Sequence, residues 1–321
     1  TWDCYAALLE HYGGHGLTET PMHHIYSEAS LGKAYLRQMG IKTWSKLQPD
    51  FPPDVLGIIM STYYGGRAEV RIRREITRVL YCDFRSMYPT VCTLMGLWRY
   101  MTSKGVEWQE WAKEARRLLN EIKLADLQKP ENWKDLNVLV QVAPDDDIFP
   151  VRTRYDQGSR TIGLNHLSAD FGLWYTLADC LAAKFLGGKE PKIIQAILFI
   201  PSAPQTGLSP IKLGGNDAFI IDPNADDFYK RVIELRGQIQ SLAATTKAAD
   251  NIREAESLDA RQQMLKLLAN STSYGIFAEL NVQSHDRPRA VICYGVEDQS
   301  SLPEQNLSKK RAHTFTHYLQ H

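Results

Sequence analysis

The clearest pattern in the chain is an apolar repeat that begins at Phe228. Apolar residues recur there at alternating steps of four and three: Phe228, Val232, Leu235, Ile239 and Leu242. This spacing predicts a long helix that packs along a partner helix. A polar stretch over residues 246–257 follows, and a second helical pattern runs from about Leu258 onwards. Together they predict an antiparallel helical hairpin.

Shorter patterns predict a mixture of helices and strands in the rest of the chain. Helical spacing is present over residues 1–12, 30–42, 107–126 and 173–186. Strand-like segments surround Gly65-Gly66 within residues 57–84. The apolar run 79–82 and the largely apolar segment 193–200 are typical of buried strands. Residues 127–172 are rich in turn residues, and residues 300–321 are polar without a sustained period. The fold class predicted is therefore α+β.

Composition adds few restrictions. The 321 residues are 44% hydrophobic and 23% charged, as in an ordinary soluble protein of two or three domains, or of one domain with large insertions. The formal charge is zero, with 37 basic and 37 acidic residues, so bulk electrostatics does not favour nucleic acid. A local arginine cluster over residues 67–78 is either a solvated strand face or a phosphate contact.

Cysteine usage and apolar runs bear on location. The five cysteines are scattered, without a C-x-x-C pair, which favours reduced thiols and a cytoplasmic protein. Neither a secretory signal nor an apolar run of about 18 residues is present, so we expect no membrane partner.

Three short motifs carry the chemistry. Residues 83–90 are Asp-Phe-Arg-Ser-Met-Tyr-Pro-Thr, and residues 266–275 are Lys-Leu-Leu-Ala-Asn-Ser-Thr-Ser-Tyr-Gly. Tyr-Tyr-Gly-Gly at residues 63–66 precedes both. In this order they resemble motif A, motif B and the Y-x-G-G motif of family B DNA polymerases. The resemblance covers roughly residues 1–290.

The resemblance implies an antiparallel palm sheet with helices behind it and a helical-hairpin fingers domain. It divides the chain into an N-terminal linker segment (1–50) that follows an absent exonuclease domain, a palm (51–224), fingers (225–276), and a palm return with a polar tail (277–321). The distance from Asp83 to Phe228 further implies a palm insertion around residues 100–215. In protein-primed relatives, an insertion at this place contacts the template and a priming protein.

The implied activity is DNA-templated DNA synthesis, in which the nucleotidyl group of a dNTP is transferred to a primer 3′-hydroxyl, pyrophosphate leaves, and two Mg²⁺ ions take part. Asp83 is then the catalytic metal ligand, and Phe84 offers its backbone carbonyl to the metal. The backbone N–H groups of Arg85, Ser86 and Met87 face the phosphates, and Tyr88 excludes a 2′-hydroxyl. Read without the resemblance, Asp83 is a turn aspartate at the end of a strand.

In the second motif, Lys266 and Asn270 are four residues apart and share one helical face, with Gln262 one turn earlier. The resemblance makes Lys266 and Asn270 triphosphate ligands; the alternative is an exposed helix face. Arg236 resembles the fingers arginine that binds phosphate, although Gln240 replaces a basic residue common four positions later. Tyr274 lies eight residues after Lys266, one residue further than the family's spacing, so either a bulge restores its contact or the contact differs.

The expected partners are dNTPs and primer–template DNA. The resemblance assigns the DNA backbone to Tyr63, Tyr64, Gly65, Gly66 and Arg67, and Gly275 to the DNA-binding end of the second motif. Further expected partners are a remaining polymerase segment, with the third motif and thumb, or a processivity or priming protein.

One motif is missing. The chain contains no convincing Y-x-D-T-D-S, which carries the second catalytic aspartate; Asp298 lies in the nearest match but with the wrong spacing of acids. No D-x-E partner for an exonuclease is found either, so we expect no proofreading. The alternative hypothesis is therefore a catalytically inactive, polymerase-derived module that binds nucleotide or nucleic acid. A third reading, an unrelated protein with chance matches, predicts binding of neither dNTP nor DNA.

Overall fold

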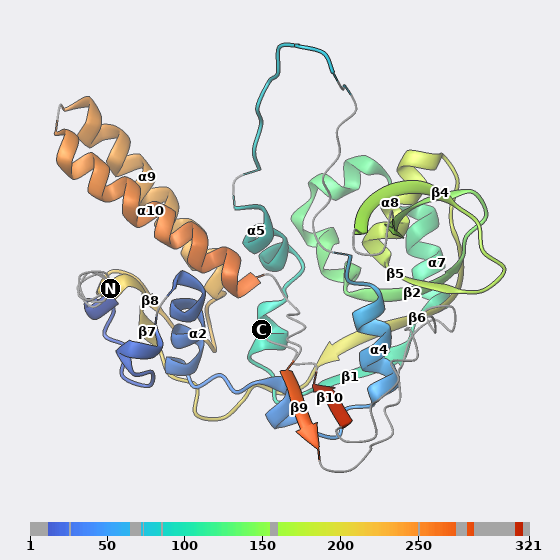
Figure 1. The fold of residues 1–321 in the computed structure, drawn as a ribbon, viewed down its shortest axis with the longest axis horizontal. Coiled ribbons are helices and arrows are strands. Elements are labelled where there is room, and N and C mark those ends of the chain that lie inside the picture. Colours follow the sequence, from blue (N-terminus) through green and yellow to red (C-terminus); the bar gives the residue numbers. More distant parts are fainter. Residues whose placement is uncertain are drawn as a thin grey trace.

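The structure is a computed structural model with a mixed α+β fold (Figure 1). It describes residues 12–25, 27–64, 72, 74–84, 86–154, 160–249, 251–273, 281–285 and 312–316. Within these residues, none of the helices combines the length and the apolar character needed to span a bilayer.

A four-stranded antiparallel sheet occupies one end of the molecule. Its strand order is β1 (Val106–Glu110), β6 (Lys192–Pro201), β2 (Val138–Ala143) and β5 (Leu173–Thr176). In the central strands Val140 pairs with Ala196 on one side and with Tyr175 on the other, and all three are buried. Helices α7 (Ala112–Glu121) and α8 (Leu177–Gly187) pack on these side chains and close the first hydrophobic core, which we call the sheet core.

A second core surrounds the helical hairpin. Helix α9 (Phe228–Ala248) runs beside α10 (Ile252–Ser273), and α2 (Glu28–Gln38) packs against α10 (Figure 1). The short hairpin of β7 (Ile211–Lys212) and β8 (Ile220–Ile221), with η4 (Leu213–Gly215) between its strands, adds buried apolar residues to the same group, which we call the hairpin core. Residues 12–41 thus share a core with the helical hairpin.

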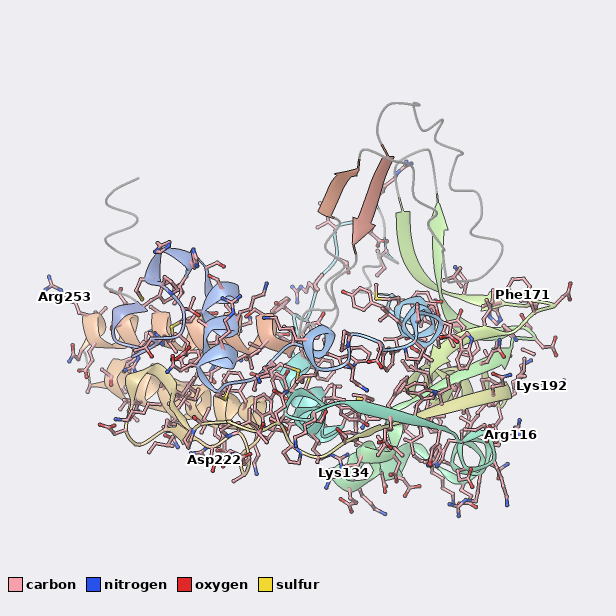
Figure 2. All side chains as sticks on the ribbon, turned by 90° about the horizontal axis from the view of Figure 1, so that it is seen from below. Arg116, Lys134, Phe171, Lys192, Asp222 and Arg253 are labelled. Carbon is pink, nitrogen blue, oxygen red and sulfur yellow. The ribbon has the colours of Figure 1, made fainter. Side chains whose placement is uncertain are left out.

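The two cores lie at opposite ends of the molecule. In Figure 2, Arg253 marks the tip of the hairpin, whereas Phe171 and Lys192 mark the far end of the sheet. Helix α5 (Met87–Leu94) lies between them and contacts α9, α10 and η3 (Pro130–Leu136). Cys92 of α5 belongs to the hairpin core, while Met95, directly after α5, packs on the sheet core. The segment after Asp83 therefore joins the two halves.

The remaining elements are short. They are η1 (Met22–His24), α3 (Trp44–Leu47), α4 (Pro53–Ser61), α6 (Trp98–Met101), η2 (Leu124–Gln128), the paired strands β3 (Asp147–Arg154) and β4 (Arg160–Leu167), and the paired strands β9 (Asn281–His285) and β10 (Ala312–Thr316).

The predicted helical hairpin is confirmed, with one correction. Phe228, Val232, Leu235 and Ile239 are buried as expected, but Leu242 is 52% exposed and Ala243 is buried in its place. A straight α-helix has 3.6 residues per turn, so an apolar stripe that repeats every 3.5 residues gradually moves off the buried face. The pairing of α9 with α10 is therefore that of a short globular hairpin.

The prediction of strands over residues 57–84 is wrong. Residues 53–61 form helix α4, which Pro53 begins at its first position with Asp54 in the first turn. Residues 75–84 have no regular secondary structure, and Val79, Leu80 and Tyr81 are each more than 80% exposed. None of the described strands pairs with this segment, so its backbone polar groups are left to water. It projects away from both cores (Figure 1).

The ends of other helices and strands also differ from those that the sequence predicts. The predicted helix over 107–126 begins only at Ala112, because residues 106–110 pair with β6 as an edge strand. The turn-rich region 127–172 contains strand β2; its valines predict a strand, but the turn residues on both sides hide this pattern in the sequence. The helix predicted over 173–186 begins at Leu177, after strand β5. The predicted strand over 193–200 and the helix over 30–42 are confirmed. Within the polar tail, residues 312–316 form β10, whereas residues 1–11 lie outside the described part.

The position of the sheet is a correction too. We expected an antiparallel sheet around Asp83, with an insertion over residues 100–215. The observed four-stranded sheet lies wholly within residues 106–201 and has its own core. The region expected to be an insertion is therefore the main β-structure of the described chain.

Candidate functional site at the junction of α5, α9 and α10

The first motif contains a strained turn at Ser86. Ser86 precedes α5 with φ 51° and ψ 45°, the left-handed region that residues with a β-carbon rarely adopt. Its carbonyl accepts a hydrogen bond from Thr90 N at 2.9 Å, which starts the helix. The side chain of Ser86 is 8% exposed. Strain of this kind persists only where the surroundings hold it, and it is frequent at functional sites.

The surroundings that hold Ser86 come from the helical hairpin. Nη1 of Arg236 on α9 donates to Ser86 Oγ at 2.6 Å, and Nε of the same guanidinium donates to Gln262 Oε1 on α10 at 3.2 Å. Gln240 Nε2, one turn along α9, donates to the same Gln262 oxygen at 3.1 Å. Arg236 and Gln262 are 8% and 7% exposed. We call these four residues the polar junction.

Neighbouring contacts fix the same three helices. Tyr229 Oη donates to the carbonyl of Thr272 at 2.8 Å, so the start of α9 is tied to the end of α10. The Cys92 thiol of α5 donates to the carbonyl of Ser273 at 3.8 Å. Burial, with Asp227 nearby, raises the pKa of Cys92 to about 12, so this thiol stays protonated and packs as an apolar group. The junction is therefore a rigid part of the fold.

Asp227 begins α9 beside this junction. Its carboxylate accepts from the backbone N–H groups of Tyr229 at 2.8 Å and Lys230 at 3.2 Å, a regular N-cap. Burial nevertheless raises the pKa of Asp227, against the lowering effect of these hydrogen bonds. Next to α5, the start of α9 is thus capped by Asp227, and the end of α10 is hydrogen-bonded to Tyr229 and Cys92.

Lys266 and Asn270 follow Gln262 at successive turns of α10. Both side chains are partly exposed, whereas Gln262 is buried. The stripe therefore begins inside the junction and continues to the surface. The predicted shared face of Lys266 and Asn270 is in keeping with the observed helix.

The structure brings together only some of the predicted site residues. Ser86 and Arg236 are bonded to each other, and Met87 and Tyr88 follow Ser86 in the first turn of α5, 45% and 40% exposed. Asp83 and Phe84 are exposed on the extended segment before Ser86. The other predicted positions lie outside the described residues: Gly65, Gly66, Arg67, Arg85, Tyr274, Gly275 and the candidate Asp298.

The Y-x-G-G tyrosines lie on the sheet side. The ring of Tyr64 stacks on Tyr175 of β5, with 5.6 Å between centroids and 5° between planes, and Tyr175 stacks in turn on Phe149 at 4.2 Å. Burial raises the pKa of Tyr175, so its hydroxyl is neutral and donates to Pro150 O at 3.1 Å. Tyr63 is 45% exposed. Tyr64 thus has a packing role here that the sequence did not predict.

The described residues do not make a two-metal site. The carboxylate of Asp83 and the carbonyl of Phe84 are hard oxygen donors of the kind that Mg²⁺ prefers. Within the described ranges, however, no three His, Cys, Asp or Glu side chains are grouped so that they could hold a metal ion. We therefore derive no step through a metal.

The role of the two glutamines at the junction was missed. The sequence pattern puts Gln262 on the face of Lys266 and shows Gln240 only as a departure from a basic residue. What could have revealed them is their spacing: Arg236 and Gln240 are one turn apart on α9, as Gln262 and Lys266 are on α10.

Comparisons with known proteins found no match for this chain. No protein-family model matches it, and neither a curated protein nor a solved structure does.

Proposed function

We propose that this chain is the nucleotide-binding part of a DNA-templated DNA polymerase of the family B type. One observation carries the proposal: Nη1 of Arg236 lies 2.6 Å from Oγ of Ser86, although the two residues are 150 positions apart in the sequence. The resemblance assigned each of them independently to the same nucleotide site. Their meeting in a hydrogen bond supports that assignment.

The chemistry of the junction suits a triphosphate. A guanidinium presents a planar fork of donors that matches phosphate oxygens, and a helix N-terminus adds unpaired N–H groups and a favourable dipole. The guanidinium of Arg236, a residue of α9, is bonded to Ser86 at the N-terminus of α5. Lys266 adds a second positive charge further along α10. Tyr88, in the first turn of α5, is exposed enough to contact the sugar of a nucleotide held there.

In this proposal Asp83 is the catalytic carboxylate, with Mg²⁺ as its metal and primer–template DNA and dNTPs as partners. Asp83 lies three residues before Ser86 and is exposed, so substrate and solvent can reach it. A second carboxylate from a further polymerase segment completes the site.

The second candidate is a module that binds nucleotide or nucleic acid without catalysis. The observation that favours it is the contrast between Asp83, on an extended and exposed segment, and the buried polar junction beside it. The candidate binding residues Ser86 and Arg236 are buried in the fold, whereas Asp83 is exposed.

Primer extension separates the two candidates. The chain is incubated with primed template, Mg²⁺ and dNTPs, beside Asp83→Asn, and dNTP affinity of both proteins is measured by titration. Extension that Asp83→Asn abolishes establishes the polymerase. Binding of dNTP or DNA without extension leaves two alternatives, a catalytic fragment that needs the further segment and the inactive module; a Y-x-D-T-D-S segment further along the reading frame identifies the fragment, and its absence identifies the module. A folded chain that binds neither dNTP nor DNA rejects both candidates.

A priming protein is a separate hypothesis for the region around residues 100–215. Its test is extension without any nucleic-acid primer, in the presence of a candidate terminal protein. Absence of a labelled product eliminates it.

A further inference from the structure

The buried glutamine Gln262 occupies an unusual place for a polar side chain. It is 7% exposed on α10, and its carbonyl oxygen accepts two hydrogen bonds, from Arg236 Nε at 3.2 Å and from Gln240 Nε2 at 3.1 Å. Both donors belong to α9. Two donors converging on one atom fix which way the Gln262 amide faces, because its NH₂ group could accept from neither.

The same contacts fix the guanidinium of Arg236. A guanidinium is planar, so holding it at Nε and at Nη1 determines the direction of the whole group. Nε is held by Gln262 and Nη1 by Ser86, at 3.2 and 2.6 Å. One contact comes from α10 and the other from the turn before α5, so the arginine is oriented by two elements other than its own.

We propose that Gln262, itself oriented by Gln240, is a positioning residue that sets the guanidinium of Arg236 for the triphosphate of a nucleotide. This inference rests on the proposed function and adds two residues to it. Gln262 contacts no substrate; it acts through Arg236. Arginine has several rotatable bonds, so an arginine held beforehand loses less conformational entropy when a phosphate binds.

The neutrality of the glutamines matters to this arrangement. A carboxylate at position 262 would form an ion pair with Arg236 and offset the charge that a triphosphate needs. An amide oxygen orients the guanidinium through a hydrogen bond and adds no negative charge beside it. Gln240 contributes in the same way, since its donor group holds the Gln262 oxygen toward Arg236.

The test is titration of the full chain with Mg²⁺ and a 2′-deoxynucleoside triphosphate, and in parallel with the corresponding monophosphate. The proteins are the unmodified chain, Gln262→Met, Arg236→Ala and the double variant. Gln263→Met is the matched control, because Gln263 is the same residue type on the exposed side of α10. Gln240→Met is the second, milder variant.

We expect Gln262→Met to weaken triphosphate affinity about tenfold, the scale of one lost charge-assisted hydrogen bond. Monophosphate affinity and the control should stay within about twofold, since surface changes seldom exceed that scale. In the Arg236→Ala background, Gln262→Met should have no further effect on triphosphate affinity, because it acts through the arginine. A loss of packing alone would not be cancelled in this way.

Other outcomes overturn the inference. If Arg236→Ala weakens triphosphate binding but neither Gln262→Met nor Gln240→Met does, positioning by glutamine is refuted while the proposed function stands. If the two effects are additive, Gln262 does not act through Arg236. If Gln262→Met fails to fold, Gln240→Met decides alone, and an unchanged affinity refutes the idea. A folded chain with no triphosphate affinity refutes the proposed function as well.

Discussion

Substitution of Gly32 by alanine tests whether the close approach of α2 to α10 holds the end of the second motif. A β-carbon at Gly32 would lie 2.6 Å from Thr272 Cγ2 and 3.1 Å from Ser271 Oγ. The first distance is 0.8 Å short of the 3.4 Å at which ordinary contact begins. Thr272 cannot easily turn away, because it is 2% exposed and its hydroxyl is bonded to the carbonyls of Leu268 and Ala269.

Two opposing effects set the magnitude. Alanine in a helix interior is favoured over glycine by about 1 kcal/mol, whereas overpacking a buried contact costs about 1–3 kcal/mol. The distance of 2.6 Å is shorter than real β-carbon contacts allow, which places the second effect in the upper part of its range, at about 2–3 kcal/mol. We expect Gly32→Ala to destabilise the hairpin core by about 1–2 kcal/mol on balance.

Amide hydrogen exchange followed by mass spectrometry is the assay, because a chain with two cores need not unfold in one step. Exchange in α2 and in the last turns of α10 should accelerate about 5- to 30-fold, as the expected free energy implies. Gly187→Ala is the control: Gly187 ends α8, and nothing lies within 4 Å of its added β-carbon.

The partner substitution sharpens the test. Thr272→Ser removes the clashing methyl group and keeps the hydroxyl, so the double variant should be more stable than Gly32→Ala alone. Gly32→Ala with unchanged or slower exchange would refute the close approach of α2 to α10. Failure of Thr272→Ser to restore protection would show that the strain lies elsewhere.

Three further predictions concern single polar groups. Burial raises the pKa of Asp227 in the folded chain, so the contribution of this carboxyl group to stability is lost as pH rises through the raised pKa. The melting-temperature advantage of Asp227→Asn over the unmodified chain should therefore grow from pH 4 to pH 7. Asp227→Ala, which removes the N-cap, should be about 1 kcal/mol less stable than Asp227→Asn. Lys184→Met removes the ammonium group that donates to the carbonyls of Asn120 and Ile122 at the C-terminal end of α7. Amide exchange there should accelerate by the equivalent of about 1.5–3 kcal/mol. Lys192→Met is the control, because Lys192 is exposed, and it should leave this exchange unchanged. Gln48→Leu removes the amide that bonds both N and O of Val106, at 2.7 and 3.2 Å, so edge strand β1 should lose protection while α8 keeps it.

Contrary results are equally specific. A melting advantage of Asp227→Asn that shrinks with pH, equal exchange after the two lysine substitutions, or an unaffected β1 would each contradict the corresponding contact.

Local patterns in the sequence predicted the elements that are long and periodic. The helical hairpin follows from Phe228, Val232, Leu235 and Ile239, because a repeated apolar stripe has few ways to be buried other than against a partner helix. The strand over residues 193–200 follows in the same way from an apolar segment that only Gln195 interrupts. The resemblance of the motifs likewise assigned Ser86 and Arg236 to one site, because it rests on residue types and spacing alone.

Tertiary structure decided what depends on a partner. The apolar run at residues 79–82 has the composition of a buried strand, yet it is exposed, because a strand is stabilised by neighbours that its own sequence does not encode. Residues 106–110 became a strand rather than a helix because β6 lies beside them. The orientation of Arg236 depends on Ser86 and Gln262, which lie far from it in sequence, and only the folded chain brings their oxygens to its nitrogens.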